Sequence, residues 1–407
     1  MVLAAAAPVL VGMIGLGMEV GGWHYAHAQA QTAADAAALD GAMELRDGRP
    51  NMVVSRALSS AARNGFSQSD DTRITTRIVQ EIGRLDMVEV TVEHEQDLTF
   101  ASLFLSGPIK VQARAVAMAS YDGVACILAL DPAAGGAVQM LGTGTLSAEG
   151  CAIASNSTHQ SGVEVGGSST VIADTIWSSG GYRRYGSSSV KVQRAPKTYV
   201  ASLPDPYGDL TVPAGLTCGK TVPKDSKGQM RLEPGVYCGG MSFGGQDDVL
   251  LAPGTYYIVD GNFEVKSSNV KIRCDCVRPT DGVSIVLTGA PAKVGIVAVE
   301  GGDVMLRPPS APDQPYSGVL FFQDRRSTSQ AASKINGNSS LQLAGALYFP
   351  RGMVHINGSS SISDLNCVQV VAKQVVMNGG GSVKLSHKDC GKTGTEVALL
   401  PGIRLHD

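Results

Sequence analysis

The sequence predicts a mainly β protein with a long N-terminal α-helix, a small α/β unit and a disulfide-bonded parallel β-solenoid. Three observations support this fold class. The first 18 residues carry no charge and lead into an alanine-rich stretch. Three segments between residues 72 and 118 alternate apolar and polar side chains, and a short motif recurs every 21 residues near the C-terminus. We therefore expect three parts, at residues 1–47, 48–120 and 121–407.

Residues 1–18 predict a transmembrane helix that continues into water. An uncharged run of this length forms a helix of roughly 27 Å, close to the thickness of a bilayer core. Trp23 and Tyr25 follow where an aromatic belt would meet the lipid headgroups. Alanine is the best helix former and no proline interrupts residues 29–45. We therefore expect one continuous helix, with Asp35 facing water.

The apolar start has a second interpretation, as a cleaved signal peptide or a simple anchor. No basic residue precedes Arg46, and no Ala-x-Ala cleavage site stands out among the many alanines. The helical pattern also continues beyond the membrane edge. These features favour the long helix, but the lack of basic residues leaves its orientation in a membrane undefined.

The second part predicts a helix and three strands. Residues 52–64 have apolar side chains at helical spacing. Residues 72–79, 86–92 and 109–118 alternate apolar and polar side chains, as half-buried strands do. We expect the apolar face of this small antiparallel sheet to pack on the exposed half of the N-terminal helix.

The third part predicts a parallel β-solenoid from its internal repeat. The motif Ile-Asn-Gly at residues 335–337 returns at 356–358, and Met-Asn-Gly follows at 377–379. A fixed period near 20 without helical pattern is typical of coils that bury their side chains by stacking. Six residues are therefore the predicted corners: Asn336, Gly337, Asn357, Gly358, Asn378 and Gly379. Chance similarity in Gly/Ser-rich sequence is the alternative.

Weaker copies of the motif extend upstream. Residues 264–270 and 299–304 share the strand–corner–strand pattern, and polar or proline-rich inserts lengthen their spacing. Residues 166–171 and 186–190 are candidates for the first coils. Residues 194–218 are rich in proline and are expected to form a crossing loop between them and the later coils.

All eight cysteines follow residue 120, which indicates disulfides in an oxidising compartment. The preferred pairs are Cys126–Cys151 and Cys218–Cys238, and each of these bridges would contribute about 3 kcal/mol. Cys367–Cys390 is a third candidate pair, and the pairing after Cys238 stays open. Cys274 and Cys276 could close on each other in a tight ring. Buried free thiols are the alternative for all eight, and a zinc site at 274–276 lacks two further ligands nearby.

The N-terminal stretch resembles a known family. Glu19, the pair Trp23 and Tyr25, and the segment Gln31–Ala42 (QTAADAAALDGA) are similar to the N-terminus of TadG-like proteins of the tight-adherence (Tad, or Flp) pilus system. The segment Cys126–Pro132 with Gly150-Cys151 resembles a later part of that family. The D-x-S-x-S metal motif that many members carry is absent from this sequence.

The resemblance implies a function and a location. The small α/β unit would be pilin-like, and the protein would be a non-enzymatic minor pilin, tip adhesin or assembly and priming factor. Its partners would be other Tad pilins and the inner membrane, with surface glycans or abiotic surfaces at the exposed end. It would be anchored in the inner membrane and periplasmic, or displayed on the cell surface or pilus. A static anchor of the pilus base is an alternative.

Glu19 has the most specific expected role. A carboxylate at the centre of a bilayer costs about 2.5–3.5 kcal/mol, and less near the interface. In a pilin-type assembly it would pair with the N-terminus or a basic group of a neighbouring subunit. The alternative is that its carboxylate reaches the membrane surface and does nothing further.

A polysaccharide-active enzyme is the remaining alternative, because β-solenoids include such enzymes. The acids available are Asp247, Asp248, Asp260, Glu264, Asp275, Asp303 and Asp324, with Arg325 and Arg326 nearby. They follow no repeat, so we expect solvated turn residues and no enzyme. No nucleotide, protease or metal motif occurs, so neither a cofactor nor a metal is expected. The net charge of −3 gives no indication of a nucleic-acid partner.

Overall fold

The structure is a computed structural model that describes residues 2–46, 49–79, 87–223, 229–336, 341–357 and 361–406. The chain divides into two compact units. The helical unit contains Met1–Asp122 and Pro401–Asp407, and the solenoid unit contains Gly123–Leu400. The fold is mainly β with a long N-terminal helix, as the sequence predicts.

Helix α1 (Val2–Arg46) packs through a line of small side chains along its second half. The buried alanines are Ala26, Ala30, Ala33, Ala34, Ala37, Ala38 and Ala42. Methyl groups allow close approach, so α2 (Val53–Arg63), which follows the 3-10 turn η1 (Pro50–Met52), packs here together with the sheet. Gly41 marks the closest approach, because a methyl group there would lie 2.9 Å from Val88.

The sheet of the helical unit is an antiparallel meander. Strand β1 (Thr72–Val79) pairs with β2 (Met87–Gln96), which pairs with the first half of β3 (Ile109–Ala129). A 3-10 turn, η2 (Ala101–Leu103), lies in the β2–β3 connection. The inward side chains of β2 are valines that face the alanines of α1, which explains why the alternating pattern predicted this sheet correctly. Strand β2 extends four residues beyond the predicted end at residue 92.

The solenoid unit contains three parallel ladders, and each coil contributes one strand to each ladder. Ladder 1 contains β13 (Gln229–Leu232), β16 (Asp248–Leu251), β19 (Lys271–Cys274), β22 (Asp303–Leu306), β25 (Leu341–Asn357), β26 (Ser361–Gly379), β27 (Ser382–Lys384), β5 (Thr145–Ala148), β8 (Thr170–Ala173) and β11 (Ser189–Val192). Long β25 and β26 bend at corners and enter all three ladders.

Ladder 2 contains β14 (Gly235–Cys238), β17 (Gly254–Val259), β20 (Val283–Thr288), β23 (Val319–Gln323), β25, β26, β3, β6 (Ala152–Ser155), β9 (Ile176–Ser178) and β12 (Lys197–Thr198). Ladder 3 contains β15 (Met241–Phe243), β18 (Phe263–Val265), β21 (Val297–Val299), β24 (Ser333–Asn336), β25, β26, β4 (Val138–Gly142), β7 (Val163–Val165) and β10 (Tyr182–Arg184). The turns η3 (Pro291–Lys293) and α3 (Cys390–Thr393) lie between strands, and β28 (Ala398–His406) returns to the helical unit.

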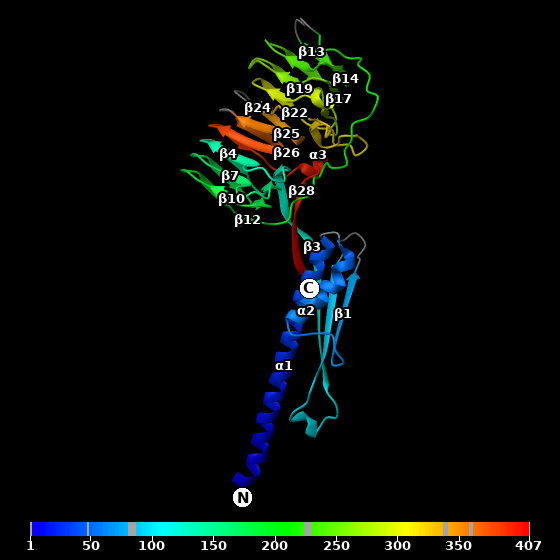
Figure 1. The fold of residues 1–407 in the computed structure, drawn as a ribbon, viewed down its shortest axis with the longest axis vertical. Coiled ribbons are helices and arrows are strands. Elements are labelled where there is room, and N and C mark those ends of the chain that lie inside the picture. Colours follow the sequence, from blue (N-terminus) through cyan, green and yellow to red (C-terminus); the bar gives the residue numbers. More distant parts are fainter. Residues whose placement is uncertain are drawn as a thin grey trace. The chain divides into compact units, whose positions relative to one another are not determined.

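The coils do not stack in the order of the chain. The last coil, from β26 and β27, stacks on the first coil, from β3, β4 and β5. In Figure 1 the stack therefore changes from green through yellow and orange to red, and then continues with cyan and green. Both ends of the stack are made by the middle of the chain, with β10–β12 at one end and β13–β15 at the other. Residues 199–218, which we call the crossing segment, lead from the β12 end toward the β13 end, where the sequence predicts a crossing loop.

The 21-residue repeat forms one corner of the solenoid. Asn336, Asn357 and Asn378 are aligned in register in three successive coils of ladder 3. Each motif copy therefore occupies the same place in its coil, as the period predicts. The predicted corner residues Gly337 and Gly358 lie outside the described residues.

A column of glycines continues this corner into the coils from the first half of the chain. Gly379, with φ of +138°, pairs with Gly142. Gly142, Gly167 and Gly186 have φ of +89°, +69° and +70°. A methyl group on Gly167 would lie 2.6 Å from the carbonyl oxygen of Gly142. Glycine is therefore required here both for the left-handed backbone and for the close approach of successive coils.

Four disulfides connect all eight cysteines. They are Cys126–Cys151, Cys218–Cys238, Cys274–Cys276 and Cys367–Cys390. Three of these disulfides are the candidate pairs named from the sequence, and the fourth is the tight ring between Cys274 and Cys276. Cys218 lies at the end of the crossing segment and joins it to β14 in the end coil.

The crossing segment is fastened along the outer face of ladder 2. The side chain of Asn156 and the backbone of Leu203 exchange two hydrogen bonds of 2.8 Å. Trp177 donates its indole N–H to Ala201 O at 3.1 Å, and Asp205 forms an ion pair with Arg325 at 2.6 Å. A second apolar core forms under this segment, outside the solenoid interior. The crossing segment thus covers a sheet face that would otherwise expose apolar side chains.

Candidate assembly surface

Two apolar segments of the helical unit are exposed beside each other. On α1 the exposed fractions are 67% for Met13, 63% for Ile14, 59% for Leu16 and 69% for Met18. On the β2–β3 connection they are 78% for Leu103, 87% for Phe104 and 50% for Leu105. We call these seven side chains the apolar surface and residues 97–105 the hairpin tip. Soluble monomers rarely expose contiguous apolar groups of this size, so this surface indicates a contact with a partner or a membrane.

Glu19 fixes the hairpin tip to α1. Its carboxylate accepts hydrogen bonds from the backbone N–H groups of Thr99 (2.7 Å), Phe100 (2.6 Å) and Ala101 (3.4 Å). These groups lead into η2, where the first N–H groups of a helical turn have no partner within the turn. A buried carboxylate supplies the missing acceptor, and Glu19 is only 7% exposed.

These hydrogen bonds change the acidity of Glu19. The Thr99 N–H has the largest effect and lowers the pKa of the Glu19 carboxyl; burial raises it, and the N–H groups of Phe100 and Ala101 lower it further. The net pKa lies below the ordinary glutamate value. A depressed pKa means that the ionised form stabilises the docked tip.

Gly15 provides the second contact between α1 and the tip. A methyl group at Gly15 would lie 2.9 Å from the ring of Phe100, so the ring packs directly on the helix backbone. Gly15 and Glu19 are four residues apart and therefore lie on the same face of the helix. Below them is a cleft of about 200 Å³, lined by Met18, Glu19, Gly22, Trp23, Gln96, Asp97, Thr99 and Phe100.

The other predicted residues of the helix do not join this contact as a group. Trp23 is half-buried and lines the cleft with Glu19. Tyr25 is 67% exposed and accepts a hydrogen bond from Gln29. Asp35 was predicted to face water, but it is half-buried and accepts a hydrogen bond from Gln31 at 2.7 Å.

Residues 2–46 form one continuous helix as predicted, but its membrane-spanning part is not shown. Within the ranges that the structure describes, no helix is both long enough and apolar enough to cross a membrane.

The hairpin tip was not among the predicted functional residues. The signal was the run TFASLFL at residues 99–105, which places four large apolar side chains in a connection between two strands. Connections are normally polar, so such a run is informative. The pairing of Glu19 with this run could not be inferred, because about 80 residues separate the partners.

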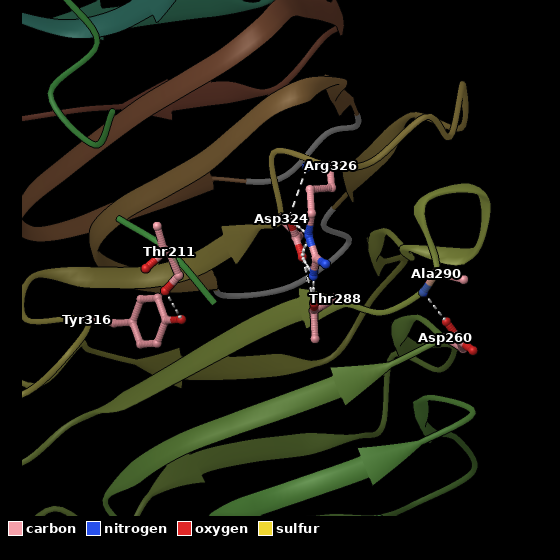
Figure 2. Close-up of polar contacts among 7 residues, drawn as sticks. All are labelled: Thr211, Asp260, Thr288, Ala290, Tyr316, Asp324 and Arg326. Atoms are coloured by element: carbon pink, nitrogen blue, oxygen red, sulfur yellow. Dashed lines mark hydrogen bonds and ion pairs between the residues drawn. The ribbon is translucent and has the colours of Figure 1, made fainter. Parts of the chain in front are cut away.

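Two of the carboxylates considered for catalysis, Asp260 and Asp324, have separate partners (Figure 2). Asp324 is 4% exposed and accepts hydrogen bonds from Thr288 (2.7 Å) and Arg326 (2.6 Å). Burial raises the pKa of Asp324, but the bonds from Arg326 and Thr288 outweigh this effect and lower the pKa. Asp260 instead accepts the Ala290 N–H at 2.7 Å. Both carboxylates thus stabilise local chain geometry.

Three further acids of that set form ion pairs within the solenoid. Asp248 pairs with Arg273, Glu264 with Lys266, and Asp275 with Arg231. Among the described residues, no three His, Cys, Asp or Glu side chains lie close enough together to hold a metal ion.

Comparisons with known proteins identify the N-terminal segment. Residues 1–44 match the model of the Flp pilus-assembly TadE/G-like family. The match ends before Cys126–Pro132, so the second part of the resemblance stays a prediction. Neither curated proteins nor solved structures give a significant match. Over the helix that carries Glu19, Trp23 and Tyr25, this chain is therefore TadE/G-like, which confirms the resemblance to TadG-like proteins of the Flp pilus system.

Proposed function

We propose that the protein is a non-enzymatic minor pilin of the Flp/Tad pilus that joins other subunits through its apolar surface. The family match over residues 1–44 supports a role in that system. The observation that carries the proposal is the exposure of Met13, Ile14, Leu16 and Met18 next to the hairpin tip.

A helix that is apolar on its exposed side requires a partner for that side. Helices of other pilins offer the same kind of surface, and glycines at 12, 15, 17, 21 and 22 allow close helix–helix approach. Gly15 is already used by Phe100, whereas a methyl group on Gly12, Gly17, Gly21 or Gly22 would meet nothing within 4 Å. These four positions leave room for a neighbouring helix.

The Glu19 carboxylate already accepts hydrogen bonds from backbone N–H groups of the hairpin tip in its own chain. If a neighbouring subunit offers an N-terminus or a basic group, Glu19 has to exchange these bonds for the new pair. The proposal therefore includes release of the tip on assembly, with the tip's apolar side chains turning to the new neighbour.

The solenoid unit serves in this proposal as a rigid display module. Its acids are divided among ion pairs and turn contacts in different coils, which supports a non-catalytic role. A rigid stack of coils held by four disulfides suits exposure outside the cell.

Fractionation of sheared filaments tests the proposal. Washed cells are sheared, and the filament and membrane fractions are probed with an antibody against the solenoid unit. We expect the protein in the filament fraction at low stoichiometry to the major pilin. Recovery in the membrane fraction alone would contradict the minor-pilin role and support a static anchor of the pilus base.

Site-specific crosslinking tests the surface itself. A photoreactive amino acid at Leu16 or Leu103 should crosslink to another pilin in assembled filaments. The matched control is Val54, which is 50% exposed on α2 but lies outside the apolar surface. Equal crosslinking from Val54 and Leu16 would show that the apolar surface has no special part in assembly.

A further inference from the structure

We propose that a groove at the β10 end of the solenoid binds a neutral oligosaccharide. The groove has a volume of about 750 Å³ and is lined by Gly135, Gln139, His159, Gln160, Ser161, Glu164, Tyr182, Arg183 and Tyr199. Its size falls within the range of small-molecule sites. The inference rests on the chemistry of this lining and does not depend on the role of the helical unit.

Outward side chains of ladder 3 form the base of the groove. Gln139 on β4, Glu164 on β7 and Arg183 on β10 are aligned in register on three successive strands. Neighbouring parallel strands are about 4.8 Å apart, so amide, carboxylate and guanidinium follow one another in a column. Each of these groups is planar and can form two parallel hydrogen bonds with adjacent hydroxyl groups.

Most of these polar groups have no hydrogen-bond partner among the described residues of the protein. In the described part of the chain, no side chain or backbone group forms a hydrogen bond or ion pair with the side chains of Gln139, Gln160 or Glu164. The guanidinium of Arg183 lies over the ring of Tyr185 at 4.9 Å and forms no ion pair with Glu164. Stacking restricts the guanidinium while leaving its N–H groups available to a ligand.

His159 adds a hydrogen-bond donor. The backbone N–H of Ser161 donates to Nδ1 of His159 at 3.1 Å, so Nδ1 has no proton in the neutral ring. The proton is then on Nε2, which has no protein acceptor among the described residues. Donors and acceptors therefore both line the groove, as a ligand with many hydroxyl groups requires.

Tyr199 supplies an aromatic face under conformational strain. It is 72% exposed, and its φ of +55° is left-handed, which is rare for a bulky residue. Its backbone N–H donates to Gly180 O at 2.9 Å, which holds the ring beside the groove. Strained backbone at an exposed aromatic residue points to a binding role, because strain persists only where the surroundings impose it.

A sugar ring matches this lining better than other ligands. It has an apolar C–H face that packs on an aromatic ring and hydroxyl groups around its rim. Glu164 and Arg183 balance each other in charge, which favours a neutral ligand over an anionic polymer. A peptide partner would call for apolar pockets, which the groove lacks.

Binding to an oligosaccharide array tests the inference. The full-length protein is applied to an array of neutral and acidic oligosaccharides, and saturation-transfer NMR then identifies which ligand protons contact the protein. We expect neutral oligosaccharides to bind, and Tyr199→Asn to weaken their binding by about tenfold or more. Asparagine tolerates the left-handed backbone, so this change removes the ring and keeps the turn.

Two further variants make the outcome decisive. Glu164→Gln keeps the shape of the side chain but removes its charge, and should weaken neutral ligands less than Tyr199→Asn does. Tyr25→Ala removes a tyrosine that is 67% exposed on α1 and should leave binding unchanged. Absence of binding to every oligosaccharide, binding of acidic ones alone, or binding that Tyr199→Asn leaves intact would each overturn the proposal.

Discussion

At the scale of single residues, Glu19 and Gly15 decide whether the hairpin tip is docked. Glu19 accepts three backbone N–H groups, and Gly15 leaves room for the Phe100 ring. A carboxylate and a glycine four residues apart on an apolar helix thus form a small receptor for a loop distant in sequence. Both residues belong to the segment that matches the TadE/G-like family.

Acidification should undock the tip. The pKa of Glu19 is lower in the folded protein than in the unfolded chain, so its stabilising contribution is full above the ordinary glutamate pKa. It is lost as the pH falls through the depressed folded value. The protection factors of the Thr99 and Phe100 amides, measured against the intrinsic exchange rate at each pH, should therefore fall at acid pH.

Glu19→Gln should produce the same loss of protection at neutral pH, because the amide oxygen carries no charge. Glu95→Gln on the same hairpin is the control, since Glu95 does not contact these N–H groups. Protection that is unchanged in Glu19→Gln would mean that the charge of Glu19 does not hold the tip.

Gly15→Ala should also undock the tip, for a steric reason. The added methyl group would lie 2.9 Å from the Phe100 ring, so the ring has to move. Gly17→Ala is the matched control, because nothing lies within 4 Å of a methyl group there. We expect faster exchange at Phe100 and Ala101 in Gly15→Ala only, and equal behaviour of the two variants would contradict the packing described.

At the scale of elements, the glycine column sets how closely successive coils approach. Gly167→Ala adds a methyl group 2.6 Å from the Gly142 carbonyl oxygen and also strains a backbone with φ of +69°. The free energy of unfolding should fall by about 2–3 kcal/mol.

Gly244→Ala is the control for this variant. Nothing lies within 4 Å of a methyl group at Gly244, so its effect should stay within about 0.5 kcal/mol. Denaturant unfolding followed by far-UV circular dichroism measures both variants. A cost for Gly167→Ala no larger than that for Gly244→Ala would show that the coils can separate at this corner without penalty.

Elements were the most predictable level of this structure. Strand β1 has the predicted bounds, because its alternation follows directly from one buried face. The Asn repeat predicted coils since stacking requires equal spacing, and the cysteine spacing favoured three of the pairs that form. The Glu19 contact and the strain at Tyr199 were not predictable, because each depends on a backbone segment brought close only by the fold.

At the scale of the whole molecule, the order of the coils was also beyond the sequence. Every coil has an apolar interior and two unpaired strand edges, one on each side. The sequence pattern therefore does not indicate which coils stack on each other. In the structure, β26 pairs with β3 and β4, which fixes the order of the coils. Contacts of Asn156, Trp177 and Asp205 hold the crossing segment in place.

A cut in the crossing segment should leave the solenoid intact. Gly215 is exposed and has nothing within 4 Å of its Cβ position, so a protease site inserted there is accessible. After cleavage, the two fragments should elute together, because β26 holds β3 and β4 by ladder hydrogen bonds. Separation of the fragments in native buffer would contradict the stacking of the last coil on the first.

A variant truncated after residue 198 provides a second test of this stacking. It lacks the coil that covers β3 and β4, and it lacks the crossing segment over ladder 2. We expect this shortened protein to aggregate or to be degraded, while the cleaved full-length protein stays soluble. A soluble, folded chain of residues 1–198 would show that the first coils need no cover.

The stacking of the last coil on the first also has a consequence during synthesis. Gln374 donates a hydrogen bond to Asp131 across 243 residues of chain. At about 5–20 residues per second, the early coils wait roughly 12–50 s for their cover to be made. Throughout that interval an open parallel edge and its apolar interior face the surrounding solution. The first half of the solenoid is therefore most prone to aggregation before the second half has been made.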